Sequence, residues 1–367
     1  MGLSALIHSA SLAGSQVRQD AAAEVNNFWR DPMKKNLIAL AVLAAAGAAS
    51  AQSSVTLYGR VDAGLVSAKA VDAAGVSLTQ TKLDSNVLNN SLWGFKGTED
   101  LGNGLKANFV LESGMSMDTG AQADTTKLFN RKATVGLSGN FGSVELGRNY
   151  TAYDTLRSAT NNTGDTNMAV TGDVWKVGGD YNLRTDNSVR FDSANYSGFS
   201  GSVAYAFGEN KNAADNLNNG ATDTVSLHVK YANGPLLVGY AHQTEEQKRS
   251  VTVPSSTKYN LIAGSYDFGV VKLNAGYNKV SGSAARGDDT EYQVGVSAPF
   301  GATTVYFGYA NGKNEIGAVE TKRAGFDLAA TYALSKRTTA YAGYKTYETK
   351  NTKIENTVYG VGVRHVF

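Results

Sequence analysis

From residue 55 onward, apolar residues alternate with polar residues or glycine along most of the chain. In the segment 323–332, for example, Phe326 and Leu328 have the opposite parity to Asp327. Alternation with a period of two is typical of strands that have one apolar and one polar face. Each such segment has about ten residues, the length of strand that crosses a tilted bilayer span. The clearest segments are 55–65, 105–112, 132–137, 271–278, 291–297 and 323–332.

The last nine residues continue this pattern to Phe367. One face holds Tyr359, Val361, Val363, His365 and Phe367, while the other holds mainly glycine and Arg364. A strand that finishes on an exposed aromatic residue suits a membrane barrel, where aromatic residues gather at the two interfaces. A closed barrel also leaves no strand edge unpaired in lipid.

The front of the chain carries a predicted secretory signal peptide at residues 33–51. Met33-Lys34-Lys35 precedes a short apolar run that ends in the small residues Ala49-Ser50-Ala51. A basic start, an apolar centre and a small-residue cleavage site are the features of such a peptide. Residues 1–32 are interpreted as a mis-assigned or upstream extension, with a genuine extension as the alternative. The mature barrel is then residues 52–367.

The connections between predicted strands alternate between short turns and long polar segments. Counting hairpins gives seven short turns and eight long connections, and hence sixteen antiparallel strands. Short turns on one side and long loops on the other are typical of outer-membrane barrels. A barrel of this size encloses an aqueous channel. The long segments include 67–89, 114–127, 149–186, 208–222, 243–257 and 281–289.

Strands of a soluble β-sandwich also alternate apolar and polar residues, so the strand pattern alone does not exclude that fold. The signal peptide, the aromatic terminal strand and the small or charged residues on the polar faces favour a barrel instead. The predicted fold class is therefore all-β, a sixteen-stranded antiparallel transmembrane β-barrel in the outer membrane.

Charge and residue types exclude several functions. The chain has 34 basic and 32 acidic residues, and without the leader 30 and 29 remain. A nucleic-acid partner would favour a basic excess. The chain has no cysteine, which rules out a Cys-based metal or redox site. No nucleophile motif accompanies His228, His242 or His365, so we expect no enzyme activity, cofactor or metal site.

Several motifs resemble, in order along the chain, the Gram-negative general porins of the betaproteobacterial type. They are Trp93-Gly-Phe-Lys-Gly-Thr-Glu-Asp-Leu-Gly102, Phe129-Asn-Arg131, Leu146-Gly-Arg148, Asp186-Asn-Ser-Val-Arg190, Ser335-Lys-Arg-Thr338 and Arg364-His-Val-Phe367. The resemblance implies a homotrimeric channel for ions and small hydrophilic solutes, in contact with lipid and lipopolysaccharide. It also implies long extracellular loops, a third loop folded into the lumen, and a terminal Phe367 that the outer-membrane assembly machinery recognises.

Candidate constriction residues follow from strand parity and from this resemblance. Parity places Arg60, Lys96, Lys132 and Arg190 on the lumen face of their strands. The longest connection, 149–186, is the candidate third loop and offers Asp154, Asp165 and Asp173 as acids. A basic wall that faces an acidic loop sorts solutes by charge as well as by diameter.

One position departs from the resemblance. In the porins that this chain resembles, an arginine often precedes Trp-Gly-Phe-Lys and points into the pore, but here the residue is Leu92. With one wall charge missing, we expect a weak preference for anions. Two other functions stay open at this point, a structural or adhesive barrel and a substrate-specific channel such as a sugar porin.

Overall fold

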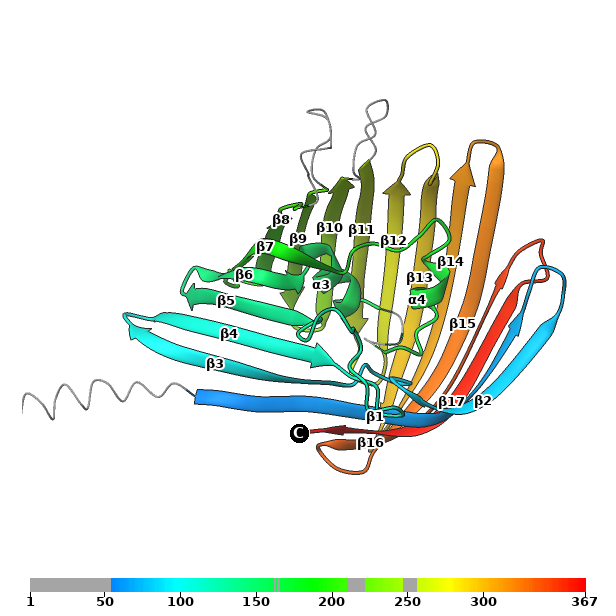
Figure 1. Ribbon diagram of the computed structural model, residues 1–367, viewed down its shortest axis with the longest axis horizontal. Helices are drawn as coiled ribbons and strands as arrows, with labels where there is room; N and C mark the ends of the chain where they lie inside the picture. Colours follow the sequence, from blue (N-terminus) through cyan, green and yellow to red (C-terminus); the bar gives the residue numbers. More distant parts are fainter. Residues whose placement is uncertain (1–53, 162, 164–165, 210–221, 247–255) are drawn as a thin grey trace, which may run out of the picture. The chain divides into compact units, whose positions relative to one another are not determined.

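The computed structural model describes residues 54–161, 163, 166–209, 222–246 and 256–367. The predicted extension 1–32 and signal peptide 33–51 lie outside these residues. The described chain is almost entirely antiparallel sheet (Figure 1). Its strands are β1 (Ser54–Val71), β2 (Ser77–Ser85), β3 (Leu92–Gly102), β4 (Leu105–Gly114), β5 (Lys132–Gly139), β6 (Gly142–Tyr150), β7 (Arg184–Ser193), β8 (Phe199–Ala206), β9 (Thr224–Asn233), β10 (Leu236–Glu246), β11 (Ser256–Asp267), β12 (Lys272–Ser281), β13 (Asp288–Phe300), β14 (Thr303–Ile316), β15 (Val319–Ala333), β16 (Thr338–Thr349) and β17 (Glu355–Val366).

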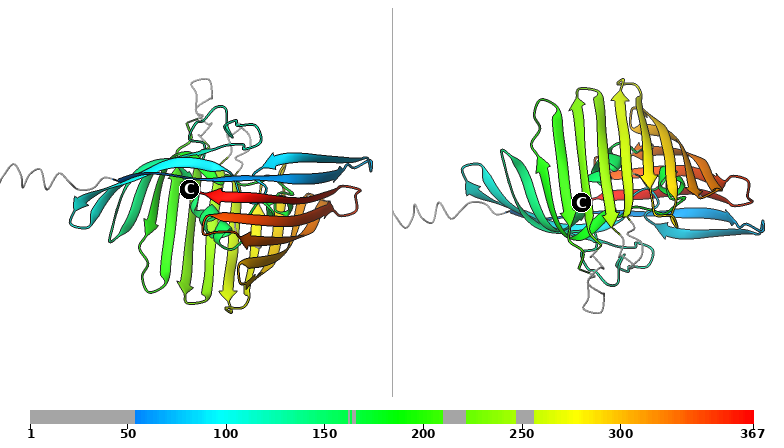
Figure 2. Two further views of the ribbon diagram at one scale, coloured as in Figure 1. Left: turned by 90° about the horizontal axis from the view of Figure 1, so that it is seen from below. Right: turned by 90° about the horizontal axis from the view of Figure 1, so that it is seen from above.

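The sheet closes on itself because β1 pairs with both ends of the strand series. Residues 60–71 of β1 pair with β17, from Arg60↔Val366 to Val71↔Glu355. On its other side β1 pairs with β3 through residues 54–60 and with β2 through residues 63–71. β2 and β3 therefore share one position in the wall, and the seventeen strands form a closed barrel of sixteen, as predicted. Figure 2 shows the strands of this barrel from two further sides.

The two faces of the wall follow the alternation in the sequence. Val135 and Leu137 of β5 are exposed on the outside, while Thr134, which precedes Val135, is buried on the inside. Exposed aromatic residues gather beside the short turns, among them Phe141, Phe268 and Phe300, as an interfacial girdle requires. Within the described residues, no helix is long and apolar enough to cross a bilayer.

The two edges of the barrel differ in how the strands are joined. One edge has short turns, such as Asn103-Gly104 and Gly234-Pro235. The other edge differs from the prediction, because the predicted long segment 67–89 contains the end of β1 and the whole of β2. Only residues 72–76 join these two strands. At this edge Gly317-Ala318 joins β14 to β15 and residues 350–354 join β16 to β17, so the expectation of eight long loops was wrong.

The connection 151–183, between β6 and β7, lies against the inner face of the wall (Figure 1). It contains α3 (Ala152–Ala159) and α4 (Thr171–Val174). Thr151 caps α3, since its side chain accepts a hydrogen bond from the backbone of Asp154. α3 contacts β8 to β11, and α4 contacts β14 and β15. We call residues 151–183 the lumen segment.

Candidate pore constriction

The beginning of the lumen segment is fixed by two side chains of the wall. The Arg190 guanidinium donates to the backbone carbonyls of Tyr150 at 2.8 Å and Thr151 at 3.2 Å, and binds Asp192 through two nitrogens. The His228 Nδ1 lies 2.8 Å from the carbonyl oxygen of Ala152. Both side chains are buried. They hold α3 against β7 and β9.

The second half of the segment is held by buried polar groups on the strands that follow. The Asp327 carboxylate of β15, which is completely buried, accepts from the backbone of Val170 at 2.8 Å and from the Thr163 hydroxyl. The Thr171 hydroxyl donates to Gln293 at 2.8 Å. These contacts place α4 on β14 and β15, further along the wall than α3.

The tip of the lumen segment meets residues 86–91, the interruption between β2 and β3. The Asn167 backbone N–H donates to the Leu88 carbonyl at 2.8 Å. Its side-chain amide donates to the Asn86 carbonyl at 2.6 Å and to the Asn90 side chain at 3.0 Å. The lumen segment therefore spans the inside of the barrel from β7 to the β2–β3 junction.

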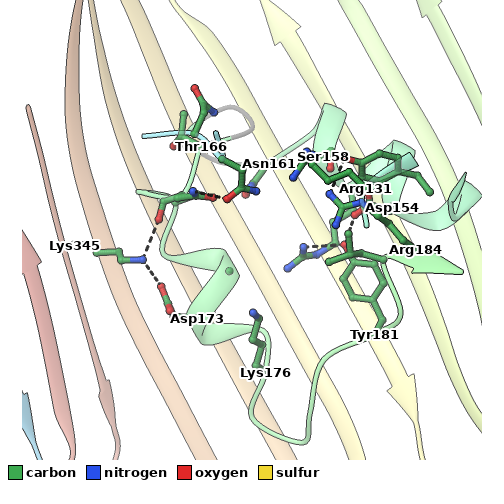
Figure 3. A pocket seen from close by; sticks show the side chains of 18 of the residues that line it. Arg131, Asp154, Ser158, Asn161, Thr166, Asp173, Lys176, Tyr181, Arg184 and Lys345 are labelled. Carbon is green, nitrogen blue, oxygen red and sulfur yellow. Dashed lines mark hydrogen bonds and ion pairs between the residues drawn. The ribbon is translucent and has the colours of Figure 1, made fainter. Parts of the chain in front are cut away.

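A cavity of about 370 Å³ lies between this segment and the β1–β7 side of the wall (Figure 3). Six cationic side chains and two carboxylates of the described residues line it. The cations come from both the strands and the lumen segment, and so the cavity carries a positive excess. They are Arg60, Arg131, Arg157, Lys176, Arg184 and Lys345, and the carboxylates are Asp154 and Asp173.

Arg131 and Arg184 share the hydroxyl of Tyr150. Their guanidinium groups donate to its oxygen at 2.8 and 2.6 Å respectively. Arg131 also binds Glu112 at 2.8 Å, which balances its charge. Arg184 lies over the Tyr150 ring, 4.3 Å from the ring centroid, where the π face attracts the cation without cancelling it.

Arg157 lies in an aromatic setting on α3. Its guanidinium carbon is 5.0 Å from the Tyr181 ring centroid and 5.6 Å from that of Trp175, and one nitrogen donates to the Tyr181 hydroxyl at 3.1 Å. That hydroxyl donates to Asp154 (Figure 3). Burial, together with the Asp154 charge, raises the pKa of the Tyr181 hydroxyl well above its ordinary value. The tyrosine therefore stays neutral and leaves the Arg157 charge in place.

The two lysines of the cavity each have an acidic neighbour. Lys345 of β16 binds Asp173 at 2.8 Å and the Asn167 carbonyl at 3.0 Å (Figure 3). Lys176 pairs with Asp180 at 2.9 Å, but both side chains are largely exposed, so water screens this pair strongly. The strand lysine thus helps to hold α4, while the loop lysine remains a charge that faces water.

The structure brings together some of the predicted constriction residues. Arg60, Asp154 and Asp173 line the cavity. Arg190 lies on the inner face but is buried as an anchor of α3. Asp165 lies outside the described residues.

Lys96 and Lys132 face inward but are not among the residues that line the cavity. Lys96 follows Leu92 by four positions along β3, about 13 Å nearer the short turns at the usual rise per strand residue. Lys132 pairs with Glu145 of the neighbouring strand at 2.9 Å. Height in the barrel and local pairing decide which of the inward-facing charges reach the cavity.

Five further cations line the cavity and were not among the predicted site residues, namely Arg131, Arg157, Lys176, Arg184 and Lys345. Arg131 belongs to the Phe129-Asn-Arg131 motif, so the motif was a usable signal. Arg184 lies within the predicted third loop, 149–186, for which only acids were proposed. Lys345 gave no local signal, because its partner Asp173 lies 172 residues away in the chain.

Sequence and structure comparisons agree with this architecture. A profile of the Gram-negative porins matches residues 38–352. An outer membrane porin protein of Bordetella pertussis is 32% identical over 91% of this chain and all of its own length. Outer membrane porin protein 32 of Delftia acidovorans is 37% identical over 84% of this chain and 88% of its own length. An anion-selective porin from Comamonas acidovorans superposes with a TM-score of 0.74 at 28% identity, over 86% of this chain and all of that one.

A closed sixteen-stranded barrel with a charged cavity inside defines the class of channel-forming outer-membrane proteins. The chain belongs to the Gram-negative porin family. It is an outer-membrane channel for passive diffusion, and it is not an enzyme.

Proposed function

We propose that this channel prefers anions among the small hydrophilic solutes and ions that it passes. The observation that carries the proposal is the excess of cations over carboxylates among the described residues of the cavity. Fixed positive charge at a narrow point of a pore attracts anions and raises the barrier for cations. The charges of Arg157 and Arg184, which lie on aromatic rings, contribute most to this field.

The proposed distribution of charge around the cavity differs from the one expected from the sequence. We expected a basic wall facing an acidic loop, but the lumen segment supplies two cations to the cavity, Arg157 and Lys176, beside its two acids. The transverse field between the two sides is therefore weaker than expected. The positive charge extends around the opening, which supports a weak anion preference even though Leu92 adds no charge. The anion-selective relative from Comamonas acidovorans is in keeping with this proposal.

The experiment that tests the proposal compares two lysine variants in planar bilayers under a salt gradient. Lys176→Gln removes a water-facing charge of the cavity, while Lys96→Gln makes the same change on β3, at a residue that does not line the cavity. We expect the wild type to show an anion-favouring reversal potential. Lys176→Gln should reduce it, and Lys96→Gln should leave it nearly unchanged.

A cation-favouring wild type would refute the proposal. Equal shifts for the two variants would show that the cavity does not control selectivity. Both outcomes are read from the same reversal potentials.

We further propose that the channel works as a homotrimer, in contact with outer-membrane lipid and lipopolysaccharide. The same recordings test the trimer, because three equal closure steps per insertion event are expected from three parallel pores. The proposed cleavage after Ala51 predicts a mature protein that begins at Gln52, which N-terminal sequencing of the outer-membrane form would show.

A further inference from the structure

The 86–91 segment is held inside the barrel by one buried carboxylate. Asp62 of β1 is 1% exposed. Its Oδ1 accepts from the backbone N–H groups of Val87 at 2.8 Å and Leu88 at 3.2 Å, and its Oδ2 accepts from that of Asn89 at 3.2 Å. Three successive N–H groups around an anion form a nest.

The backbone of the segment is shaped for this nest. Asn86 has a φ of 63°, a left-handed conformation that asparagine tolerates better than most residues. Its side chain accepts from the Ser91 N–H at 2.5 Å, which closes the segment on itself. Ser91 in turn binds the backbone of Asp62, through the Asp62 N–H at 3.0 Å. The interruption between β2 and β3 is therefore a built element with its own hydrogen bonds.

Other parts of the wall hold the same segment. The Tyr341 hydroxyl of β16 donates to Asp62 at 2.9 Å. Arg364 of β17 donates to the Asn89 side chain at 2.6 Å, and Arg60 donates to the Asn90 carbonyl at 2.9 Å. Leu88, which is 1% exposed, packs in an apolar cluster with Met168 of the lumen segment.

The exposed side of the segment forms part of the channel lining. Asn89 and Asn90 line the cavity together with Arg60 and Asn167. The segment also receives the three hydrogen bonds from Asn167 at the tip of the lumen segment. Its position thus sets how far the tip extends across the lumen.

We propose that Asp62 is a positioning residue that sets the width of this channel. By holding the 86–91 segment inside the barrel, it builds the wall on which the tip of the lumen segment rests. Without the carboxylate, three buried N–H groups and the Tyr341 hydroxyl lose their acceptor, a loss that favours withdrawal of the segment. This inference rests on the channel function and not on the proposed anion preference.

The test is a pair of variants with a matched control. Asp62→Asn removes the charge from the nest and replaces one of its two acceptor oxygens by an NH₂ donor. Asn167→Ala removes the side chain that reaches the segment from the other side. Asp84→Asn makes the same chemical change at an exposed pair with Lys82 in β2. We expect both Asp62→Asn and Asn167→Ala to raise single-channel conductance and the size limit for sugars in liposome swelling, and Asp84→Asn to change neither.

The double variant Asp62→Asn/Asn167→Ala distinguishes this role from a merely structural one. If both residues hold the same contact, the double variant should conduct about as well as the more conductive single variant. A fall in folded yield with unchanged conductance of the surviving channels would overturn the proposal, as would additive effects. Channel width is measured by conductance and by the size limit for sugars, whereas selectivity is measured by the reversal potential. This proposal and the proposed anion preference can therefore fail separately.

Discussion

Neighbouring side chains decide how strongly each cation of the lumen acts on a solute. Arg131 and Lys345 contact carboxylates, so a solute at a distance from either pair experiences little net charge. Arg157 and Arg184 lie on aromatic rings, and each has a buried guanidinium nitrogen without a hydrogen-bond partner among the described residues. A guanidinium remains charged at every physiological pH. These two arginines are therefore best placed to attract a passing anion.

Leu92 offers a test of charge at one position of the wall. It pairs with Arg60, where β3 lies beside β1, and is buried at the first position of β3. We expect Leu92→Arg to shift the reversal potential further toward anions, because it adds a second guanidinium beside Arg60. Leu92→Met, which keeps size without charge, is the control. A shift toward cations, or the same shift in both variants, would contradict this expectation.

At the scale of elements, the sequence predicted the strands that have a regular lipid-facing side. It missed β2, which has no such side. β5 and β15 alternate strictly, because one of their faces touches hydrocarbon. In β2, Leu78 and Leu83 have opposite parity and both are exposed, so no alternation marked the strand. Pairing with β1 forms it instead. The lumen segment was predictable as a long connection, but its contacts with β15 and β16 join residues more than 100 positions apart, which no local pattern records.

The docking of α3 gives a prediction about a single element. Arg190→Met removes the bonds to Tyr150, Thr151 and Thr155, and a hydrogen bond to a charged group contributes about 1.5–3 kcal/mol. We expect α3 to loosen and single-channel conductance to rise, with little loss of barrel closure.

Lys132→Met is the matched control for this variant, since it removes an inward-facing cation that pairs with Glu145 of the neighbouring strand. Conductance should stay near the wild-type value in the control. If both variants raised conductance equally, loss of inward charge rather than release of α3 would be the cause.

At the scale of the whole molecule, closure depends on the seam between β1 and β17. The Gly59 N–H donates to the Phe367 carbonyl at 3.1 Å, and the Phe367 N–H donates back at 3.0 Å. A Cβ at Gly59 would lie 2.4 Å from the Phe367 ring and 2.7 Å from the Leu92 carbonyl oxygen. Only glycine allows this approach. The prediction that the final strand closes the barrel is confirmed by its register with β1.

Gly59 has the parity of the exposed residues Val55 and Leu57, opposite to that of the cavity residue Arg60, so disturbing the seam at Gly59 and Phe367 should affect assembly and not permeation. We expect deletion of Phe367 to lower the yield of folded trimer, measured by heat-modifiable migration on gels, through its proposed role as the assembly signal. Gly59→Ala should also lower the yield, because overpacking of this kind costs about 1–3 kcal/mol. The channels that do form should conduct like the wild type. Altered conductance in either variant would show that the seam also shapes the pore.

The lumen segment joins β6 and β7 at its two ends, is fixed near its start by Arg190 and His228, and is held at its middle by Asn167 and Asp327. It behaves mechanically as a loop that is fixed at its ends and supported at its middle. A loop held in this way bends much less under thermal agitation than one held at its ends alone. The current through an open channel should therefore be steady, with little flicker, and freeing the middle should make the trace noisy before it makes the pore wide.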